Sequence, residues 1–272
     1  VVKNIRKDII SMGGEVHFGC KLTNIIYAND FIHGIEYTTA SGEVKDIETD
    51  CLVLCIGHSA RDTVKMLFDS GIRMEQKAFS VGTRIEHPQE LINKAQYGTE
   101  WNNPLLGAAD YKLNAVTKSG SAYTFCMCPG GTVVAASSEE GGMVVNGMSE
   151  YARDGENANT ALLVGLEPGT FGSDDPLAGI ELQRKIERAG FIQGGGDYTA
   201  PAQLVGDFLN DRKSTKLGAV RPTCPTGVAL GDIRTVLPEY VTKTIAQAIV
   251  AFDKKLKSYA LPDAVLTAPE SR

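Results

Sequence analysis

The sequence contains no continuous apolar run of about 18 residues, and no charged segment followed by an apolar one opens it. Both absences argue against a membrane-spanning helix and a secretory leader, so we expect a cytoplasmic protein with no membrane partner. The formal net charge is −6, and no dense stripe of Lys and Arg alternates with aromatic residues, which argues against a nucleic-acid partner. The most basic stretch, residues 254–257, ends a helical pattern, and we interpret it as a solvated helix end.

Two kinds of ligand motif are missing as well. No G-x-G-x-x-G follows a predicted strand, and the nearest glycine run, residues 194–196, follows a helical pattern and precedes Asp-Tyr-Thr, so its flanks are wrong for a dinucleotide fingerprint. No His or second Cys pair stands at a metal-ligand spacing, and we expect no metal site. Internal repeats and low-complexity linkers are also missing from the sequence.

The most informative stretch that is present is residues 51–62, CLVLCIGHSARD. Its first five residues predict a strand buried on both faces, Gly57 predicts a sharp turn, and Ser59 with Asp62 has the spacing of a capping box that opens a helix ending at Gly71. Such a turn brings bare backbone N–H groups to the edge of a sheet, where phosphate-bearing ligands bind. An ordinary strand-to-helix turn without a ligand explains the pattern too, and both interpretations stay open.

The rest of the chain predicts two regions of mixed structure. In residues 1–57 we expect a helix at 1–12 and strands at 15–18, 22–27, 31–39, 44–48 and 51–55, of which the middle three form an antiparallel meander. In the second region we expect strands at 79–86, 122–127, 132–136, 143–146 and 160–166 and helices at 87–94, 174–190, 200–209 and 237–259. Residues 122–136 predict a hairpin turned by Pro129, Gly130 and Gly131. The chain opens on Val1 inside a helical pattern and closes without a final element, so we expect a segment of a longer polypeptide.

Six short stretches, in this order, resemble a family of bacterial FAD-dependent dehydrogenases often described as NAD(FAD)-utilizing dehydrogenases. They are residues 56–62 (IGHSARD), 84–89 (RIEHPQ), 125–131 (FCMCPGG), 146–149 with 153–159 (NGMS and RDGENAN), 221–227 (RPTCPTG) and 270–272 (ESR). The resemblance covers nearly the whole chain. It implies an α/β (α+β) fold in which a partial FAD domain like that of glutathione reductase carries a large inserted mixed α+β cap or substrate domain.

The resemblance also divides the chain. It implies a partial FAD-binding domain at residues 1–68, the inserted domain at 69–260, and the start of a segment returning to the FAD domain at 261–272. Measured against the family, the sequence lacks the N-terminal G-x-G-x-x-G unit and the C-terminal glycine-rich FAD segment. We therefore expect FAD in the longer parent protein and little or none bound by this segment alone.

The resemblance further implies where the cofactor comes close to the chain. Gly57 lets the backbone approach FAD, and the extended backbone near residue 21 meets the adenine. The implied cofactor-binding residues are Lys21, Leu22, Cys55, Gly57, His58, Ser59 and Arg61. His58 is also a candidate catalytic acid or base, because an unperturbed imidazole titrates near neutral pH; the alternative is that it only makes a hydrogen bond at the helix start. NADH or NADPH is a candidate electron donor.

Two cysteines stand next to the predicted glycine turn. In a regular strand Cys126 and Cys128 face the same way with Cα atoms about 6.5–7 Å apart, at the edge of disulfide geometry. Reduced thiols buried in the core explain the pair. The alternatives are that one of them faces the active site of the parent enzyme as a candidate catalytic residue, or that the pair is a thiol redox centre.

A polar stretch at residues 153–159 lies between two predicted strands. One interpretation is an exposed loop whose charges satisfy each other. The other is a recognition loop in which Arg153 binds a carboxylate or phosphate in a forked, charge-assisted pair. On the second interpretation, the candidate substrate-binding residues are Arg153, Asn157, Gly130 and Gly131.

The leading hypothesis is a fragment of a flavoprotein oxidoreductase, a dehydrogenase that transfers a hydride or electrons through FAD to or from an unidentified small-molecule substrate. We expect the fragment to be inactive alone. The alternative is a non-catalytic domain that has kept the fold and binds a nucleotide or a partner, and the missing glycine fingerprint keeps this alternative open.

Overall fold

A computed structural model of the chain, in which residues 1–271 are described, confirms the mixed α/β class predicted from the sequence. The chain divides into two compact units, Val1–Glu75 and Gln76–Arg272. The first contains a three-stranded sheet, and the second contains a seven-stranded sheet and a two-stranded one. Within residues 1–271, no helix combines the length and the apolar composition that crossing a membrane requires.

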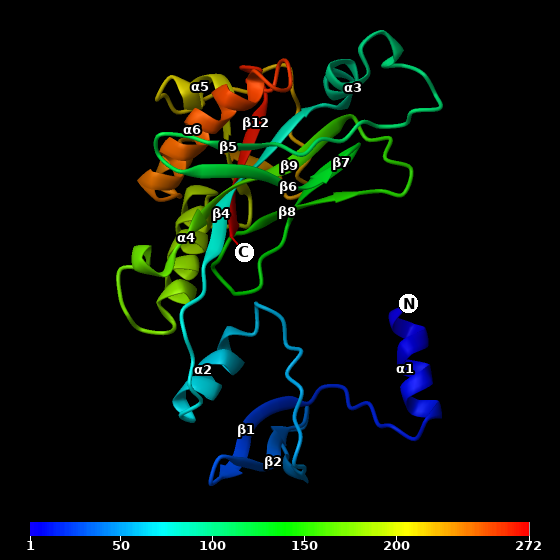
Figure 1. Cartoon of the computed structure of the whole chain (residues 1–272), viewed down its shortest axis with the longest axis vertical. Coiled ribbons are helices and arrows are strands. Elements are labelled where there is room, and N and C mark those ends of the chain that lie inside the picture. The colour runs from blue at the N-terminus through cyan, green and yellow to red at the C-terminus, as the bar shows by residue number, and fades with distance from the viewer. Residues whose placement is uncertain (272) are drawn as a thin grey trace. The chain divides into compact units, whose positions relative to one another are not determined.

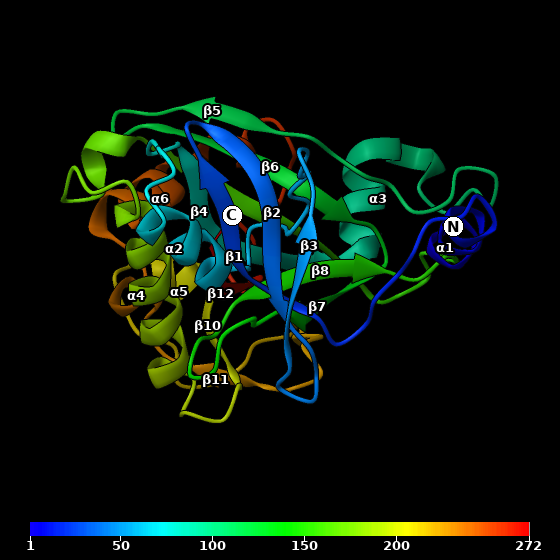
Figure 2. The same cartoon turned by 90° about the horizontal axis from the view of Figure 1, so that it is seen from below.

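The first unit is a meander with two helices. It contains α1 (Val2–Ser11), β1 (Lys21–Ala28), β2 (Phe31–Thr38), β3 (Val44–Glu48) and α2 (Arg61–Asp69). The three strands lie side by side as the predicted antiparallel meander (Figure 2). Among residues 1–75, all of which the structure describes, the buried apolar side chains are Ile25 and Leu67, and α1 buries none. The core of this unit is therefore small.

Three predictions for the first unit were wrong. Residues 51–55, predicted to be a buried strand, are extended, mostly exposed, and pair with no strand among the described residues; Val53 is 77% exposed. A strand needs a hydrogen-bonded neighbour, and the three strands of this unit pair with one another instead. Residues 15–18 also form no strand. Helix α2 is present, but its N-cap is Ala60 and no side chain caps it, so Ser59 does not have the predicted capping role.

The second unit contains the remaining strands and helices. Their bounds are β4 (Phe79–Pro88), α3 (Gln89–Tyr97), β5 (Asn114–Val116), β6 (Ser121–Cys128), β7 (Gly131–Ala135), β8 (Val145–Ser149), β9 (Asn157–Leu166), α4 (Ala178–Gln193), β10 (Ala200–Leu204), α5 (Val205–Leu209), β11 (Val228–Leu230), α6 (Glu239–Asp253) and β12 (Val265–Ser271). Seven strands form one sheet in the order β11-β10-β12-β4-β9-β6-β5. Strands β10 and β11 are parallel and the other neighbours are antiparallel. Strands β7 and β8 form a separate antiparallel pair (Figure 1).

The two faces of the large sheet differ in chemistry, because side chains alternate along each strand. On one face, Ile85 and Leu162 belong to the main apolar core together with side chains of α6 such as Ile245. The other face, over which β7 and β8 lie (Figure 1), carries buried polar side chains from β4 and β9. These side chains are Arg84, Glu86, Asn157 and Asn159.

Three predictions for the second unit were also wrong. Strands β6 and β7 do not form a hairpin: β6 already has β5 and β9 on its two edges, so the turn at residues 129–131 leads the chain out of the sheet to pair with β8. Residues 200–204, predicted to be helical, form β10, because burial between β11 and β12 overrides local preference. The expectation that the chain closes without a final element was wrong as well, because strand β12 lies in the same sheet, between β10 and β4. The predicted domain boundaries, including the role of residues 261–272, stay predictions.

Candidate functional site

A fully buried arginine lies at the centre of the polar face. The Arg84 guanidinium on β4 donates through Nε and Nη2 to the two carboxylate oxygens of Glu270 on β12, at 2.6 and 3.2 Å. Nη1 donates to the carbonyl oxygen of Cys126 at 2.8 Å and to Oδ1 of Asn159 at 3.2 Å, and Nη2 donates to Oδ1 of Asn146 at 2.9 Å. Arg84 is 0% exposed, so these charge-assisted bonds do not compete with water. We call these five residues the arginine cluster.

The arginine cluster joins stretches of the chain that are far apart in the sequence. It takes side chains from residues 84–89, 146–149, 153–159 and 270–272, and a backbone carbonyl from residues 125–131. These are four of the six stretches on which the family resemblance rests, since 146–149 and 153–159 count as one; the other two are residues 56–62 and 221–227. Arg272, the last residue of the 270–272 stretch, lies outside the described residues.

Glu86 connects residues 221–227 to the polar face of the large sheet through hydrogen bonds. Its Oε1 accepts hydrogen bonds from the Thr223 hydroxyl at 2.6 Å, the Thr223 backbone N–H at 3.1 Å and Nδ2 of Asn157 at 3.2 Å. Nδ2 of Asn157 also donates to the Arg221 carbonyl oxygen at 2.8 Å. Burial raises the pKa of Glu86 although these bonds oppose the rise, and Oε2 has no hydrogen-bond partner among the described residues. The Asn157 amide is thus used inside the protein, and its contact with a substrate stays a prediction.

Strand β6 is irregular next to Arg84. Its register with β9 shifts between Phe125 and Cys128, which inserts one extra residue and makes a β-bulge. Within the bulge, Cys126 has a φ of +47°, in the left-handed region that residues with a Cβ rarely occupy. Cys126 is exposed, whereas Ala122 on the same strand is buried. The bulge therefore turns this cysteine outward.

The second cysteine of the pair lies on the inner side of the bulge. The Cys128 thiol donates to the Cys126 carbonyl oxygen at 3.4 Å, and its Sγ is 4.0 Å from Nη1 of Arg84. Burial raises the pKa of the Cys128 thiol. Both cysteines are free thiols, and only Cys128 is buried, so the interpretation of the pair as core thiols is confirmed for Cys128 and wrong for Cys126.

Gly130 and Gly131 form a tight turn against the loop that contains Arg153. Gly130 has a φ of +49°, and a Cβ there would lie 2.1 Å from the Arg153 carbonyl oxygen. A Cβ on Gly131 would lie 2.5 Å from the Met148 carbonyl oxygen. The N–H of Gly155 donates to the Gly130 carbonyl oxygen at 3.2 Å. Three of the four candidate substrate-binding residues are therefore neighbours, and glycine is required at two of them.

An open groove of about 870 Å³ lies over the bulge and the glycine turn, lined by residues 126–129 and 147–153. We call it the bulge groove. Met148 is 62% exposed and Tyr151 104% exposed at its side. Arg153 is exposed, and its guanidinium makes no hydrogen bond or ion pair with the described residues. The groove thus offers apolar surface, an unpaired cation and one accessible thiol. Nothing in the spacing of Met148 and Tyr151 marked them beforehand.

The residues predicted to approach FAD lie in the first unit. Gly57 has a φ of +71°, and a Cβ there would meet nothing within 4 Å, so its backbone is open to a ligand. His58 and Ser59 are exposed, and Ser59 Oγ lies 3.3 Å from Nε2 of His58. Lys21 Nζ lies 2.6 Å from the Asp62 carboxylate, and this contact lowers the pKa of Asp62.

This set fits one edge of a FAD site but not a complete one. The open backbone at Gly57, just before α2, suits a phosphate oxygen. Arg61 is only 3% exposed, Leu22 is half-buried and Cys55 is exposed on a segment without a strand partner among the described residues. The sequence also contains no G-x-G-x-x-G to hold the pyrophosphate. The cofactor contacts of these residues stay predictions.

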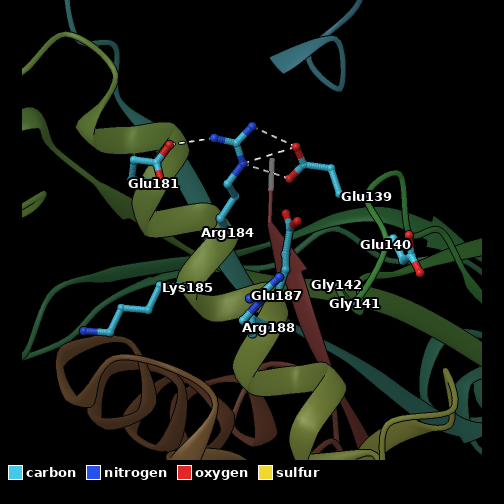
Figure 3. Close-up of a pocket in the computed structure, with 9 residues that line it drawn as sticks. All are labelled: Glu139, Glu140, Gly141, Gly142, Glu181, Arg184, Lys185, Glu187 and Arg188. Atoms are coloured by element: carbon cyan, nitrogen blue, oxygen red, sulfur yellow. Dashed lines mark hydrogen bonds and ion pairs between the residues drawn. The ribbon is translucent and has the colours of Figure 1, made fainter. Parts of the chain in front are cut away.

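A second pocket, of about 510 Å³, lies beside α4 and was not predicted (Figure 3). Arg184 donates through Nε and Nη2 to Glu139 at 2.8 to 3.1 Å and through Nη1 to Glu181 at 2.6 Å. Figure 3 shows the Arg184 guanidinium between these two carboxylates. Glu187 accepts a hydrogen bond from the Ser271 hydroxyl at 2.8 Å. These charged groups satisfy one another, so this pocket is a salt-bridged surface and not our candidate site.

Comparisons with known proteins place the bulge groove inside a matched region. A family model described as "FAD-dependent protein, C-terminal domain-like" matches residues 78–272. The chain is also similar to a protein of Clostridium beijerinckii (strain ATCC 51743 / NCIMB 8052) named "Uncharacterized protein", with 50% identity over 274 residues. That match covers 100% of this chain and 50% of the relative, so the chain spans about half the length of the curated relative it matches.

Proposed function

The chain belongs to the family of FAD-dependent proteins whose C-terminal domain model it matches, and from this membership we propose that it is part of a flavoprotein oxidoreductase. The proposed reaction is transfer of a hydride or electrons to or from a small-molecule substrate. FAD supplies this redox chemistry when bound, and NADH or NADPH is the proposed electron donor. Because the chain spans about half of its relative, we propose that the active protein is a longer polypeptide.

Each part of the chain has a proposed role in that polypeptide. Residues 1–68 contribute to the FAD-binding domain, residues 69–260 form the cap or substrate domain, and residues 261–272 begin the return to the FAD-binding domain. The proposed compartment is the cytoplasm. The open backbone at Gly57 supports the first assignment, and the separate sheet of the second unit supports the second.

The observation that carries the proposal is the convergence of distant stretches beneath the bulge groove. Arg84, Glu270, Asn146 and Asn159 come from four strands, and all are held in one network directly under the Cys126 bulge. Bulges and strained non-glycine residues gather at functional sites. We therefore place the substrate in the bulge groove.

The groove residues have distinct proposed roles. Met148 and Tyr151 provide apolar surface that removes water from one side of the substrate. The unpaired Arg153 guanidinium binds a carboxylate or phosphate group in a forked pair. The turn at Gly130 and Gly131 packs directly against the backbone of Arg153 and Met148, and so fixes the position of the groove wall that carries them. This turn lies close to Cys126, which is the exposed member of the pair Cys126 and Cys128.

A second candidate function is a non-catalytic binding domain. Phe125, Met148 and Tyr151 are 50%, 62% and 104% exposed and come from neighbouring parts of the same unit. Exposed apolar side chains that gather on one surface mark interaction sites of many kinds, including sites for other proteins. On this reading the groove binds a partner and no electrons are transferred.

The experiment uses the longer polypeptide with Met148 and Tyr151 both changed to Ala. Its flavin is reduced with NADH or NADPH, and turnover is followed with whichever small organic acceptor reoxidises it best. We expect flavin to be retained and kcat/KM for the acceptor to fall at least tenfold. The matched control is Ile192→Ala, which removes an equally exposed apolar side chain (70% exposed) from α4 and should change kcat/KM less than about twofold. Unchanged turnover in the groove variant would contradict the placement of the substrate, and a flavin that no acceptor reoxidises would favour the binding domain.

A further inference from the structure

We infer that Arg84 is a positioning residue for the bulge groove: it holds the backbone of Cys126 in the bulge that presents the Cys126 thiol to the groove. The inference deepens the proposed function, on which its relevance to a substrate rests. The geometry itself involves only side chains and backbone of the second unit.

The backbone of Cys126 has a conformation that needs support from its surroundings. A φ of +47° brings the Cβ of an L-residue close to the following carbonyl group, so this conformation is unfavourable unless the surroundings hold it. The carbonyl oxygen of Cys126 accepts a 2.8 Å charge-assisted bond from Nη1 of Arg84 and a longer thiol bond of 3.4 Å from Cys128. The guanidinium makes the stronger of the two contacts and is therefore the group that holds the bulge.

Without the bulge, the Cys126 side chain would lie on the buried face of β6. Ala122 and Thr124 are 1% and 3% exposed and lie opposite Val164 and Leu162 on β9, whose side chains belong to the apolar core. By alternation, Cys126 in a regular β6 would point to the same buried face. The extra residue of the bulge turns it outward instead. Accessibility of the Cys126 thiol therefore reports whether the bulge is present.

The Arg84 guanidinium is itself held in place by its partners. Its guanidinium is neutralised by Glu270, whose side chain is 1% exposed, and its remaining donors are used by Asn146 and Asn159. A buried ion pair of this kind is rarely more stabilising than apolar side chains of similar volume, so stability alone does not explain an arginine here. Every N–H group of the Arg84 guanidinium is used, and a guanidinium bonded in this way favours one conformation over its alternatives. The position of the Cys126 carbonyl is therefore set by five strands at once.

The groove is also coupled to Arg84 through its lining. Gly147, which lines the groove, is so close to the arginine cluster that a Cβ would lie 2.6 Å from Nη1 of Arg84 and 2.2 Å from Oδ1 of Asn159. A movement of the guanidinium therefore reaches the groove at two places, the bulge and the Gly147 backbone.

The test uses Arg84→Lys in a chain whose Cys20, Cys51 and Cys55 are changed to Ser, so that Cys126 is the remaining exposed thiol. Lysine keeps the positive charge beside Glu270 but has no planar fork to bond Glu270 and Cys126 together. The rate of alkylation by iodoacetamide is measured by mass spectrometry. We expect the rate at Cys126 to fall at least fivefold. Arg184→Lys, at the paired arginine of α4, is the matched control and should leave the rate unchanged. An unchanged or faster rate in Arg84→Lys, with the fold intact, overturns the inference.

A double-mutant cycle covers the case in which Arg84→Lys is too unstable for alkylation. Glycine adopts a φ of +47° without strain, so Cys126→Gly should raise the melting temperature relative to Cys126→Ala when the bulge is present. We expect this gain in melting temperature when Arg84 is unchanged. With Arg84→Lys we expect little or no gain, because the bulge is then lost. The same gain in both backgrounds overturns the inference. Neither readout uses flavin or turnover, so failure here is distinguishable from failure of the proposed function.

Discussion

Glu86 and His87 are consecutive residues of β4, and burial moves their pKa values in opposite directions. Burial raises the pKa of Glu86 and lowers that of His87 to about 4, because in both cases the neutral form is favoured out of water. Alternation along the strand places Glu86 on the polar face of the sheet and His87 among the aromatic rings of the core, where its Nε2 lies 2.7 Å from the Tyr259 carbonyl oxygen. The two residues therefore give stability two opposite dependences on pH.

His87 predicts a loss of stability in mild acid. Unfolded His has a pKa of 6.5 and folded His87 a pKa of about 4, so between these values the unfolded chain binds more protons. The free energy of unfolding should fall as the pH falls from 6.5 to 4, by about 3 kcal/mol in total. His87→Gln keeps a donor for Tyr259 and should remove this slope. Urea unfolding of both chains at several pH values, followed by fluorescence of the single Trp101, checks it; equal slopes would contradict the assignment.

Glu86 predicts the opposite trend. Burial raises its folded pKa above the ordinary value of 4.5, so above pH 4.5 the unfolded chain has lost a proton that the folded chain retains. This residue therefore lowers stability as the pH rises from 4.5 through its folded pKa. In Glu86→Gln the amide oxygen keeps the three bonds of Oε1, and the variant should be at least as stable as the parent at pH 7. A variant clearly less stable than the parent at pH 7 but not at pH 4.5 would show that the carboxylate is ionised when folded.

At the residue level, part of the site could be predicted from the sequence. Gly130, Gly131 and Arg153 were expected to act together and are neighbours in the structure. The burial of Arg84 could not be predicted, because a charged residue that alternates with apolar ones on an antiparallel strand normally faces solvent. Its partner Glu270 is remote in the sequence, and no local pattern connects the two.

At the level of the elements, the glycine turn between β6 and β7 fixes the shape of the groove. We predict that Gly130→Ala lowers the free energy of unfolding by about 2 kcal/mol or more, because the residue has positive φ and the new Cβ would collide with the Arg153 carbonyl oxygen. Trp101 fluorescence in a urea titration measures the change. The control is Gly165→Ala on β9, where a Cβ meets nothing within 4 Å and stability should stay within about 0.5 kcal/mol. Equal effects at the two glycines would refute the steric argument.

Elements with strong periodicity and a buried face could be predicted, and those that depend on a partner could not. Strands β4 and β9 and helix α6 are where their apolar patterns put them, although the ends of α6 are shorter than predicted. Residues 51–55 have the apolar composition of a buried strand but pair with no strand among the described residues, because composition does not supply a neighbour. The turn at residues 129–131 looked like a hairpin because the sequence does not reveal that both edges of β6 are occupied.

At the scale of the whole molecule, the two units have unequal cores. The first unit buries few apolar side chains, whereas the second has the large core on α6. Residues 70–78 join them without helix or strand, and Arg73 and Lys77 are exposed there. We predict that brief trypsin treatment cleaves at these residues and leaves the second unit folded. Mass spectrometry should find a fragment beginning at Met74 or Ala78. Its melting curve, followed by Trp101 fluorescence, should match that of the intact chain. A fragment without that transition would show that the second unit depends on the first.

We propose that this chain supplies the groove, and only part of the FAD site, of a longer flavoprotein. The most direct measurement is the visible absorption spectrum of the longer polypeptide, purified beside the 272-residue chain and with FAD added to both. We predict a flavin spectrum that stays with the longer polypeptide through gel filtration and a colourless 272-residue chain. A longer polypeptide that remains colourless would contradict the oxidoreductase proposal. Stoichiometric flavin on the short chain would contradict the assignment of an incomplete FAD site to it.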